Sequence, residues 1–142
     1  MRQRLRKHGF SEDEIGPAIR QAVDAGLIDD ATFARLWVED RIIHSPRSRR
    51  AVERELLEKG IDRVICQAAV QQHYPESRER ELLWALASER FERLSRLDSE
   101  TRARRTIGFL ARRGFPPGGA ARMIKQLETE QRQDMAQEAN DE

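Results

Sequence analysis

Leu5-Arg-Lys-His-Gly-Phe10, Leu56-Leu-Glu-Lys-Gly-Ile61 and Leu110-Ala-Arg-Arg-Gly-Phe115 are the three segments of the sequence that decide the fold. Their glycines lie 51 and 54 residues apart, so the segments mark an internal repeat. Glycine takes the left-handed conformation that ends a helix at little cost, and the apolar residue after it can then pack against the leucine. Each segment therefore predicts a helix, a tight turn at Gly9, Gly60 or Gly114, and a second helix.

The residues around these turns predict where further helices begin. Asp62 is placed to cap the helix after the second turn, and Pro116-Pro117 supplies the first positions of the helix after the third. A third helix precedes the second and third pairs. In the second copy we expect Asp29 or Asp30 to cap that leading helix, and Ser45-Pro46 to begin the helix that follows it.

Apolar residues recur at helical spacing along nearly the whole chain, and the alternating runs and hairpin turns typical of strands are absent. We predict an all-α fold of tandem three-helix repeats in an elongated, curved helical array, because such small units complete their cores by stacking. The first repeat, 1–28, is incomplete and lacks its leading helix. The second spans 29–74 and the third 75–127. An acidic polar tail, 128–142, follows as a frayed helix or a disordered segment.

The composition favours a cytoplasmic protein. The chain has 142 residues, with 26 basic and 25 acidic side chains and a net charge of +1. No apolar run approaches the length of a membrane span, and the first residues lack the apolar core of a signal peptide. The single cysteine excludes an intrachain disulfide framework and indicates a reducing compartment.

The positive charge is unevenly distributed and is almost entirely arginine, since only three basic residues are lysine. Residues 126–142 hold six acids and one base, so the rest of the chain is moderately basic. Arginines cluster in 41–54 and 102–113, on the second helix of a repeat or the turn before it, and basic residues also cluster in 1–7. Such clusters indicate contact with a polyanion. The candidate contact residues are Arg41, Arg47, Arg49, Arg50, Arg54, Arg102, Arg105, Arg112 and Arg113.

The alternative interpretation of these clusters is a solvated helix face with pairing between residues four apart. Glu53 and Glu55 are available for such pairs in the first cluster. The segment 102–113 has no acidic residue of its own, so this interpretation explains it less well.

The sequence gives little support for catalysis. His8, His44 and His73 fall in different repeats, without the spacing of metal ligands. Cys66 occupies a core position of its repeat and is expected to act as a small apolar residue. The segment Pro116-Pro117-Gly118-Gly119 lacks the preceding strand and the Lys-Ser/Thr ending of a phosphate-binding loop. We therefore expect no enzyme activity, catalytic residue, metal site or cofactor.

Three stretches resemble the RecX family: Gly26-Leu-Ile-Asp-Asp-Ala-Thr-Phe-Ala34 with Arg41 after it, Glu55-Leu-Leu-Glu-Lys-Gly-Ile61, and Phe109-Leu-Ala-Arg-Arg-Gly-Phe115. The resemblance covers about residues 1–127 and implies tandem three-helix repeats. It also implies a cytoplasmic modulator, mainly an inhibitor, of the RecA recombinase in DNA repair, recombination and the SOS response. Proteins of the family bind in the groove of the RecA–DNA filament and hinder strand exchange, ATP hydrolysis and coprotease activity. The implied partner is the RecA nucleoprotein filament, with DNA phosphates secondary, and neither a membrane nor a small-molecule substrate.

The sequence departs from the family at two places. The family usually has glycines in the loop where this chain has Ser45-Pro46-Arg47-Ser48, and it usually has a further helix before the first Leu-x-x-x-Gly-Phe segment.

A second hypothesis is an independent DNA-binding module of helix-turn-helix type, because small three-helix units resemble such domains. That module would need a face of Asn, Gln and Arg side chains to distinguish bases, and the sequence shows no evident one. Aromatic platforms for stacking single-stranded bases are also not evident, since Trp37 and Trp84 lie on predicted helices where we expect them to be packed.

Overall fold

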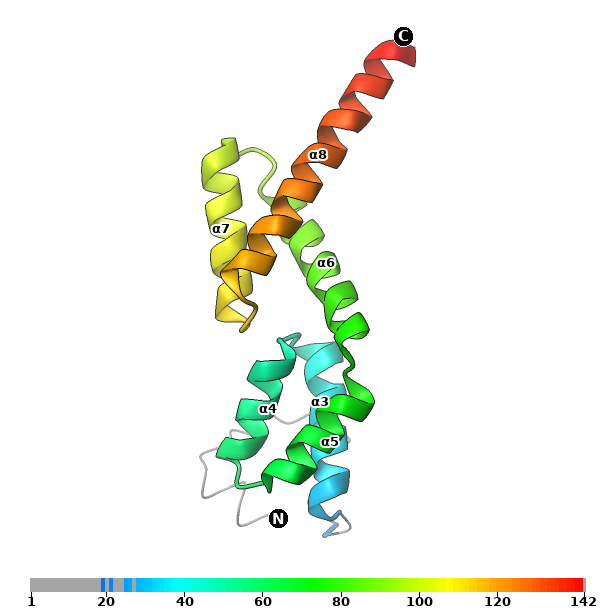
Figure 1. Cartoon of the computed structure of the whole chain (residues 1–142), viewed down its shortest axis with the longest axis vertical. Coiled ribbons are helices and arrows are strands. Elements are labelled where there is room, and N and C mark those ends of the chain that lie inside the picture. The colour runs from blue at the N-terminus through cyan, green and yellow to red at the C-terminus, as the bar shows by residue number, and fades with distance from the viewer. Residues whose placement is uncertain (1–18, 20, 22–24, 27, 142) are drawn as a thin grey trace. The chain divides into compact units, whose positions relative to one another are not determined.

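The computed structural model describes residues 19, 21, 25, 26 and 28–141. Across this part of the chain every regular element is an α-helix, which confirms the predicted all-α fold. The predicted turn at Gly9 and the basic cluster of 1–7 lie outside the described residues. The six helices are α3 (Asp30–His44), α4 (Arg49–Glu58), α5 (Arg63–His73), α6 (Glu76–Arg93), α7 (Ser99–Arg112) and α8 (Pro117–Asp141) (Figure 1).

The helices belong to two compact units, which we call unit 1 (Met1–Glu79) and unit 2 (Arg80–Glu142). Unit 1 contains α3, α4 and α5, and unit 2 contains α7, α8 and most of α6. The repeat boundaries predicted from the sequence remain predictions. None of the described helices is both long and apolar enough to cross a membrane.

The helix starts follow the capping rules in most places. The Asp29 carboxylate accepts a hydrogen bond from the Thr32 amide at 2.8 Å, and the Asp62 carboxylate accepts one from the Val64 amide at 3.1 Å. These bonds satisfy amide groups that have no partner within the helix. Asp98 caps α7 in the same way, since its carboxylate accepts a hydrogen bond from the Thr101 amide.

The prediction that Ser45-Pro46 begins the next helix is wrong. Ser45 is instead the C-cap of α3, and α4 begins at Arg49. Ser48 caps α4, because its hydroxyl accepts a hydrogen bond from the Ala51 amide at 3.1 Å. Ser48 is also buried, so this cap is fixed by packing as well as by its hydrogen bond.

The two described glycine turns have the predicted geometry. Gly60 and Gly114 have φ angles of 83° and 91°, in the left-handed region that favours glycine. The Ile61 amide donates to the Leu56 carbonyl at 3.1 Å, and the Phe115 amide donates to the Leu110 carbonyl at 3.1 Å. The amides of the two glycines also bond back into the preceding helix. This is the Schellman pattern, which ends a helix and reverses the chain within a few residues.

Each unit has its own apolar core. In unit 1 the helices α3, α4 and α5 contact one another, and the rings of Phe33 and Trp37 stack with centroids 5.9 Å apart. The Leu56 side chain from the glycine turn and Tyr74 after α5 are also fully buried. The core of unit 1 thus draws on α3, α4 and α5, the helices that the described residues of this unit form, and on the turn between α4 and α5.

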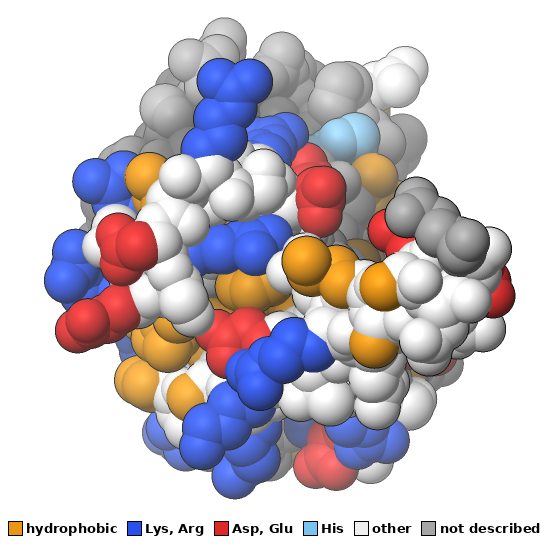
Figure 2. All heavy atoms as spheres, turned by 90° about the horizontal axis from the view of Figure 1, so that it is seen from above, with side chains coloured by type: hydrophobic (Ala, Val, Ile, Leu, Met, Phe, Trp, Pro, Cys, Tyr) orange, Lys and Arg blue, Asp and Glu red, His pale blue; other side chains and the backbone are white. Residues whose placement is uncertain are grey.

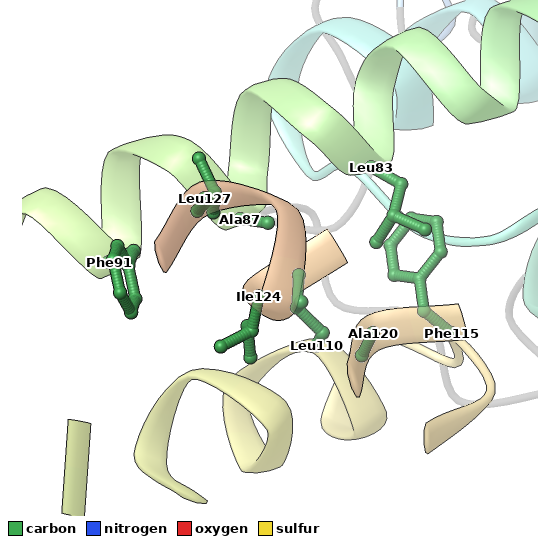
Figure 3. Close-up of a cluster of buried hydrophobic side chains, with 8 residues drawn as sticks. All are labelled: Leu83, Ala87, Phe91, Leu110, Phe115, Ala120, Ile124 and Leu127. Atoms are coloured by element: carbon green, nitrogen blue, oxygen red, sulfur yellow. The ribbon is translucent and has the colours of Figure 1, made fainter. Parts of the chain in front are cut away.

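In unit 2, eight buried side chains from α6, α7, α8 and the turn before α8 form one cluster, which Figure 3 shows between these elements. Leu110 and Phe115, which flank the third glycine, meet residues of α6 and α8 there. The partly buried Trp84 packs against this cluster, as the sequence predicts. The eight residues are Leu83, Ala87, Phe91, Leu110, Phe115, Ala120, Ile124 and Leu127.

The tail is helical through Asp141, as a continuation of α8. Leu127 is the last buried residue, and every residue of 132–141 is exposed. Figure 1 shows this part of α8 extending past α7. Residues 128–141 are therefore part of α8 in the structure, in the part of the helix that follows the core of unit 2.

Candidate nucleic-acid interface

The nine arginines predicted to contact a partner fall into two classes in the structure. One class makes contacts within the protein and comprises Arg41, Arg47, Arg49, Arg102 and Arg113. The other class is exposed and has no hydrogen bond or ion pair among the described residues; it comprises Arg50, Arg54, Arg105 and Arg112.

Arg41 lies in the core of unit 1. Its guanidinium sits 4.1 Å from the centroid of the Trp37 ring, and its Nε lies 3.5 Å from a carboxylate oxygen of Glu55. The Lys59 ammonium lies 4.8 Å from the same ring centroid. Only 6% of the Arg41 side chain is exposed. In the structure Arg41 therefore packs between α3 and α4 inside unit 1, and its contact with a partner stays a prediction.

Glu55 is the carboxylate at the centre of this cluster. Its Oε2 atom also lies 3.0 Å from Nη1 of Arg47, in the loop before α4. Burial raises the pKa of Glu55 above its ordinary value, and the opposing attraction of Arg41, Arg47 and Lys59 lowers it by less. One side chain thus connects α3, the loop and α4.

Tyr74 also binds the loop before α4, through Arg47, and the first residue of α4, Arg49. Its hydroxyl donates a hydrogen bond to the Arg47 carbonyl at 2.6 Å, and its own carbonyl accepts one from Nε of Arg49 at 2.6 Å. The Arg49 amide donates to a carboxylate oxygen of Glu79 at 2.7 Å. Burial raises the pKa of the Tyr74 hydroxyl, so it remains a donor at neutral pH. The loop Ser45-Pro46-Arg47-Ser48 is therefore held by hydrogen bonds at Arg47 and Ser48, at the end that leads into α4.

Arg102 has a comparable structural role in unit 2. Its guanidinium carbon lies 3.4 Å from the centroid of the Phe91 ring. Its Nε donates to the Phe91 carbonyl at 2.8 Å, and its Nη1 donates to the Gln131 side chain at 3.0 Å. Arg102 thus connects α6, α7 and α8. The sequence could not show this role, since both acceptors lie on other helices.

The exposed arginines occur on the second helix of each described three-helix set. Arg50 and Arg54 lie four residues apart on α4, and Arg105 and Arg112 lie seven apart on α7, so each pair shares one face of its helix. Arg113 also belongs to α7's C-terminal end, where its guanidinium lies 5.4 Å from the centroid of the Phe109 ring. Figure 2 shows several separate Lys and Arg side chains on the face that it draws, with acidic and hydrophobic side chains between them.

The structure also places a polar face on α5 that sequence reasoning missed. Arg63, Gln67 and Gln71 follow one another at four-residue intervals and are all exposed. Beside them, a groove of about 580 Å³ runs between α4 and α5, and Arg49 and Arg50 line its other wall. The four-residue spacing of these side chains, on the helix predicted after the turn at Gly60, was the signal that could have identified this face.

Cys66 and the two described histidines show no arrangement for chemistry. Burial, together with the negative charges of Glu53 and Asp62, raises the pKa of Cys66 to about 11, so its thiol is protonated at neutral pH. Nδ1 of His73 lies 4.0 Å from a carboxylate oxygen of Glu39, and His44 is exposed. Within the described part of the chain, no three His, Cys, Asp or Glu side chains are grouped so that they could hold a metal ion.

The chain is similar to proteins of one family. The family model of the second three-helix domain of RecX matches residues 29–70, and that of the third matches residues 78–118. The regulatory protein RecX of Amycolatopsis mediterranei strain U-32 is 38% identical over 126 residues, which are 89% of this chain and 71% of that protein. The regulatory protein RecX of Streptomyces coelicolor is 35% identical over 130 residues, or 92% of this chain and 69% of that protein.

A solved structure supports the fold. The crystal structure of RecX from Lactobacillus salivarius matches with a TM-score of 0.61 and 24% sequence identity, over 90% of this chain and 82% of that one. At this identity the likeness concerns the fold alone.

Proposed function

Since this chain belongs to the RecX family of regulatory proteins, we propose that it binds the RecA–DNA filament and inhibits the recombinase, ATPase and coprotease activities of RecA. In this role it acts by binding in the cytoplasm and not by catalysis. RecA and the DNA within the filament are the proposed partners. The observation that carries the proposal is the pair of arginines exposed at the second helix of each three-helix set.

The exposed arginines suit such a partner for two reasons. A guanidinium presents a planar fork of donors that matches phosphate and carboxylate groups, both of which a protein–DNA filament offers. The pairs Arg50 with Arg54 and Arg105 with Arg112 have no partner among the described residues. They therefore need not break an existing ion pair in order to bind.

The overall charge supports the same role. With a net charge of +1, the chain has little long-range attraction for nucleic acid. Binding then depends on local surfaces, which favours a defined filament over DNA in general.

The deciding experiment is RecA-catalysed strand exchange in the presence of the full chain. We expect inhibition by the wild-type protein at concentrations below that of RecA protomers. Replacing Arg50, Arg54, Arg105 and Arg112 with glutamine should weaken inhibition, whereas Arg93→Gln, whose side chain already pairs with Glu89 at 2.7 Å, should not. A wild-type protein without effect at a large excess over RecA would refute the proposal.

A second candidate function is an independent module that reads duplex DNA, and the α5 face favours it. Arginine and glutamine side chains are the residues that form paired hydrogen bonds with guanine and adenine, and Arg63, Gln67 and Gln71 are exposed along one face. Selection from random duplexes distinguishes the candidates. Enrichment of one sequence by the wild type, lost in Gln67→Ala/Gln71→Ala but kept in the control Gln126→Ala, would favour this module over the filament regulator.

A further inference from the structure

Gly108 lies in the middle of the sequence of α7 and is half-buried, and the protein's own structure does not require a glycine there. Its φ angle is not positive, so an L-amino acid could adopt the same backbone. A Cβ atom built at this position would meet only Nη1 of Arg112, at 3.5 Å, which is ordinary van der Waals contact. Alanine would fit there, and it is a far better helix former than glycine in a helix interior.

Arginines surround this glycine. Arg104 and Arg105 lie one turn before it and Arg112 one turn after it, and all three are exposed. Arg105 and Arg112 have no hydrogen bond or ion pair among the described residues. Ala111, the other residue one turn after Gly108, is small and exposed. From 101 to 113 the helix has no acidic side chain. We call Arg105, Gly108, Ala111 and Arg112 the Gly108 face.

The helix dipole explains only part of this arrangement. Cations near a helix C-terminus are favourable, which accounts for Arg112 near the end of α7. Arg104 and Arg105 lie in the middle of the helix, where the effect has faded. Neither the dipole nor internal packing explains a glycine between Arg105 and Arg112.

We propose that the Gly108 face holds the phosphodiester backbone of DNA, with Arg105 and Arg112 on either side of a strand that approaches the helix at Gly108. This inference rests on the proposed function, in which DNA lies within the filament, and it assigns α7 to the DNA rather than to RecA. The absent side chain leaves room for the strand, and the arginines supply the fork-shaped donors that bind phosphates.

The dimensions of the face fit a nucleic-acid strand. Residues seven apart on a helix are separated by about 10 Å along its axis. A strand of B-DNA carries one phosphate per roughly 3.4 Å of axis, so Arg105 and Arg112 span about three nucleotides. A run of arginines without acids also suits a uniform polyanion better than a protein surface, where both signs of charge alternate.

The test measures DNA affinity of the full chain by fluorescence anisotropy, with one labelled oligonucleotide used single-stranded and as a duplex, at several salt concentrations. Gly108→Leu should weaken binding about tenfold, because losing one charge-assisted contact has about that effect. Gly108→Ala should weaken it less while raising the midpoint of thermal unfolding, since alanine stabilises the helix. A variant that is more stable but binds less well cannot be explained by damage to the fold.

The matched control is Gly118→Ala, at another helical glycine where a Cβ atom would meet nothing within 4 Å; its DNA affinity should not change. In Arg105→Gln/Arg112→Gln, the slope of log affinity against log salt should fall by about 1.8 for the duplex, since each lost phosphate contact removes about 0.9. Arg132→Gln, at an exposed arginine of α8, should leave the slope unchanged.

Three results would overturn the inference. They are no binding of either DNA by the wild type at low salt, unchanged affinity in Gly108→Leu, or an unchanged slope in the double arginine variant. If Gly108→Leu weakened binding to RecA filaments while naked DNA binding stayed the same, the face would contact protein instead. A wild type that binds DNA through α7 but does not inhibit strand exchange would refute the proposed function and leave this inference standing.

Discussion

Unit 1 packs the Arg41 guanidinium against a carboxylate, whereas unit 2 packs that of Arg102 against neutral oxygen atoms. In both units an arginine covers an aromatic ring, Trp37 or Phe91. Arg41 then pairs with Glu55, while Arg102 donates to a main-chain carbonyl and to Gln131. The two units place a guanidinium in a similar setting, but only unit 1 does so with a titratable partner.

This difference has consequences for stability. A buried ion pair stabilises little in net terms, yet removing one partner leaves an uncompensated charge and costs much. Hydrogen bonds to neutral acceptors cost less when the arginine is removed, because no charge stays behind. Unit 1 should therefore be sensitive to changes at its carboxylate and to pH, and unit 2 should be less so.

The largest effect should come from Glu55→Ala. This substitution leaves the Arg41 guanidinium in the core without its carboxylate, and we expect a loss of about 3 kcal/mol in the free energy of unfolding. Urea denaturation followed by Trp37 fluorescence in a Trp84→Phe background measures it in unit 1. Glu58→Ala, at an exposed position of the same helix, is the control and should cost less than about 0.5 kcal/mol. Equal losses in the two variants would contradict the comparison.

Arg102→Ala should have the next largest effect, on unit 2. It removes two hydrogen bonds and the contact with the Phe91 ring, for an expected loss of about 2 kcal/mol. Urea denaturation followed by Trp84 fluorescence in a Trp37→Phe background reports this unit. A loss greater than that of Glu55→Ala in unit 1 would show that the carboxylate is not what separates the two units.

The glycine turns should show no difference between the units. Gly60→Ala and Gly114→Ala each place a side chain at a positive φ, which costs roughly 1 kcal/mol for an L-amino acid. Thermal unfolding should show similar decreases in the unfolding midpoint of the two variants. Trp37 fluorescence reports the Gly60 variant in unit 1, and Trp84 fluorescence reports the Gly114 variant in unit 2. Gly118→Ala, in a helix, should not decrease stability. A large loss at only one of the two turns would mean that its surroundings, and not its backbone, control the effect.

The smallest effect should be the pH dependence of unit 1. Burial raises the pKa of Glu55 above its ordinary 4.5 in the folded state, so the folded protein binds this proton more tightly than the unfolded chain. The stabilisation that this raised pKa gives the folded state is therefore fully present below pH 4.5. It is lost as the pH rises through the pKa of Glu55 in the folded protein.

Urea denaturation of unit 1 at several pH values checks this prediction. Glu55→Gln cannot titrate, so it should remove the part of the decline in unfolding free energy with rising pH that comes from Glu55. If the wild type and Glu55→Gln had parallel profiles, Glu55 would not be the group responsible.

The local features of the fold could be predicted from the sequence. The turns at Gly60 and Gly114 and the caps at Asp29 and Asp62 depend on hydrogen bonds between residues two to five positions apart, so their signals lie within short segments. Ser48 was missed as the cap of α4 because Ser45-Pro46 offered an equally good local signal. The choice between them was made by burial of Ser48 and by the bonds of Tyr74 to the loop.

The candidate interface could be predicted only in part. The sequence located both arginine clusters, but it treated their members alike. In the first cluster Arg41 is buried and Arg50 is exposed, and in the second Arg102 binds two other helices while Arg105 is exposed. The α5 face was missed although its four-residue spacing is present in the sequence, because the exposure of Arg63, Gln67 and Gln71 follows from how α5 packs against α3 and α4.

The sequence by itself determined the family, the all-α fold and the positions of the glycine turns, because helix periodicity and helix ends are set by residues close together in the chain. Only the tertiary structure decided which arginines are available to a partner. That choice depends on Glu55, Tyr74 and Gln131, which lie between 8 and 29 residues away from the arginines they bind. The packing of helices brings these groups together, and no local pattern of residues records it.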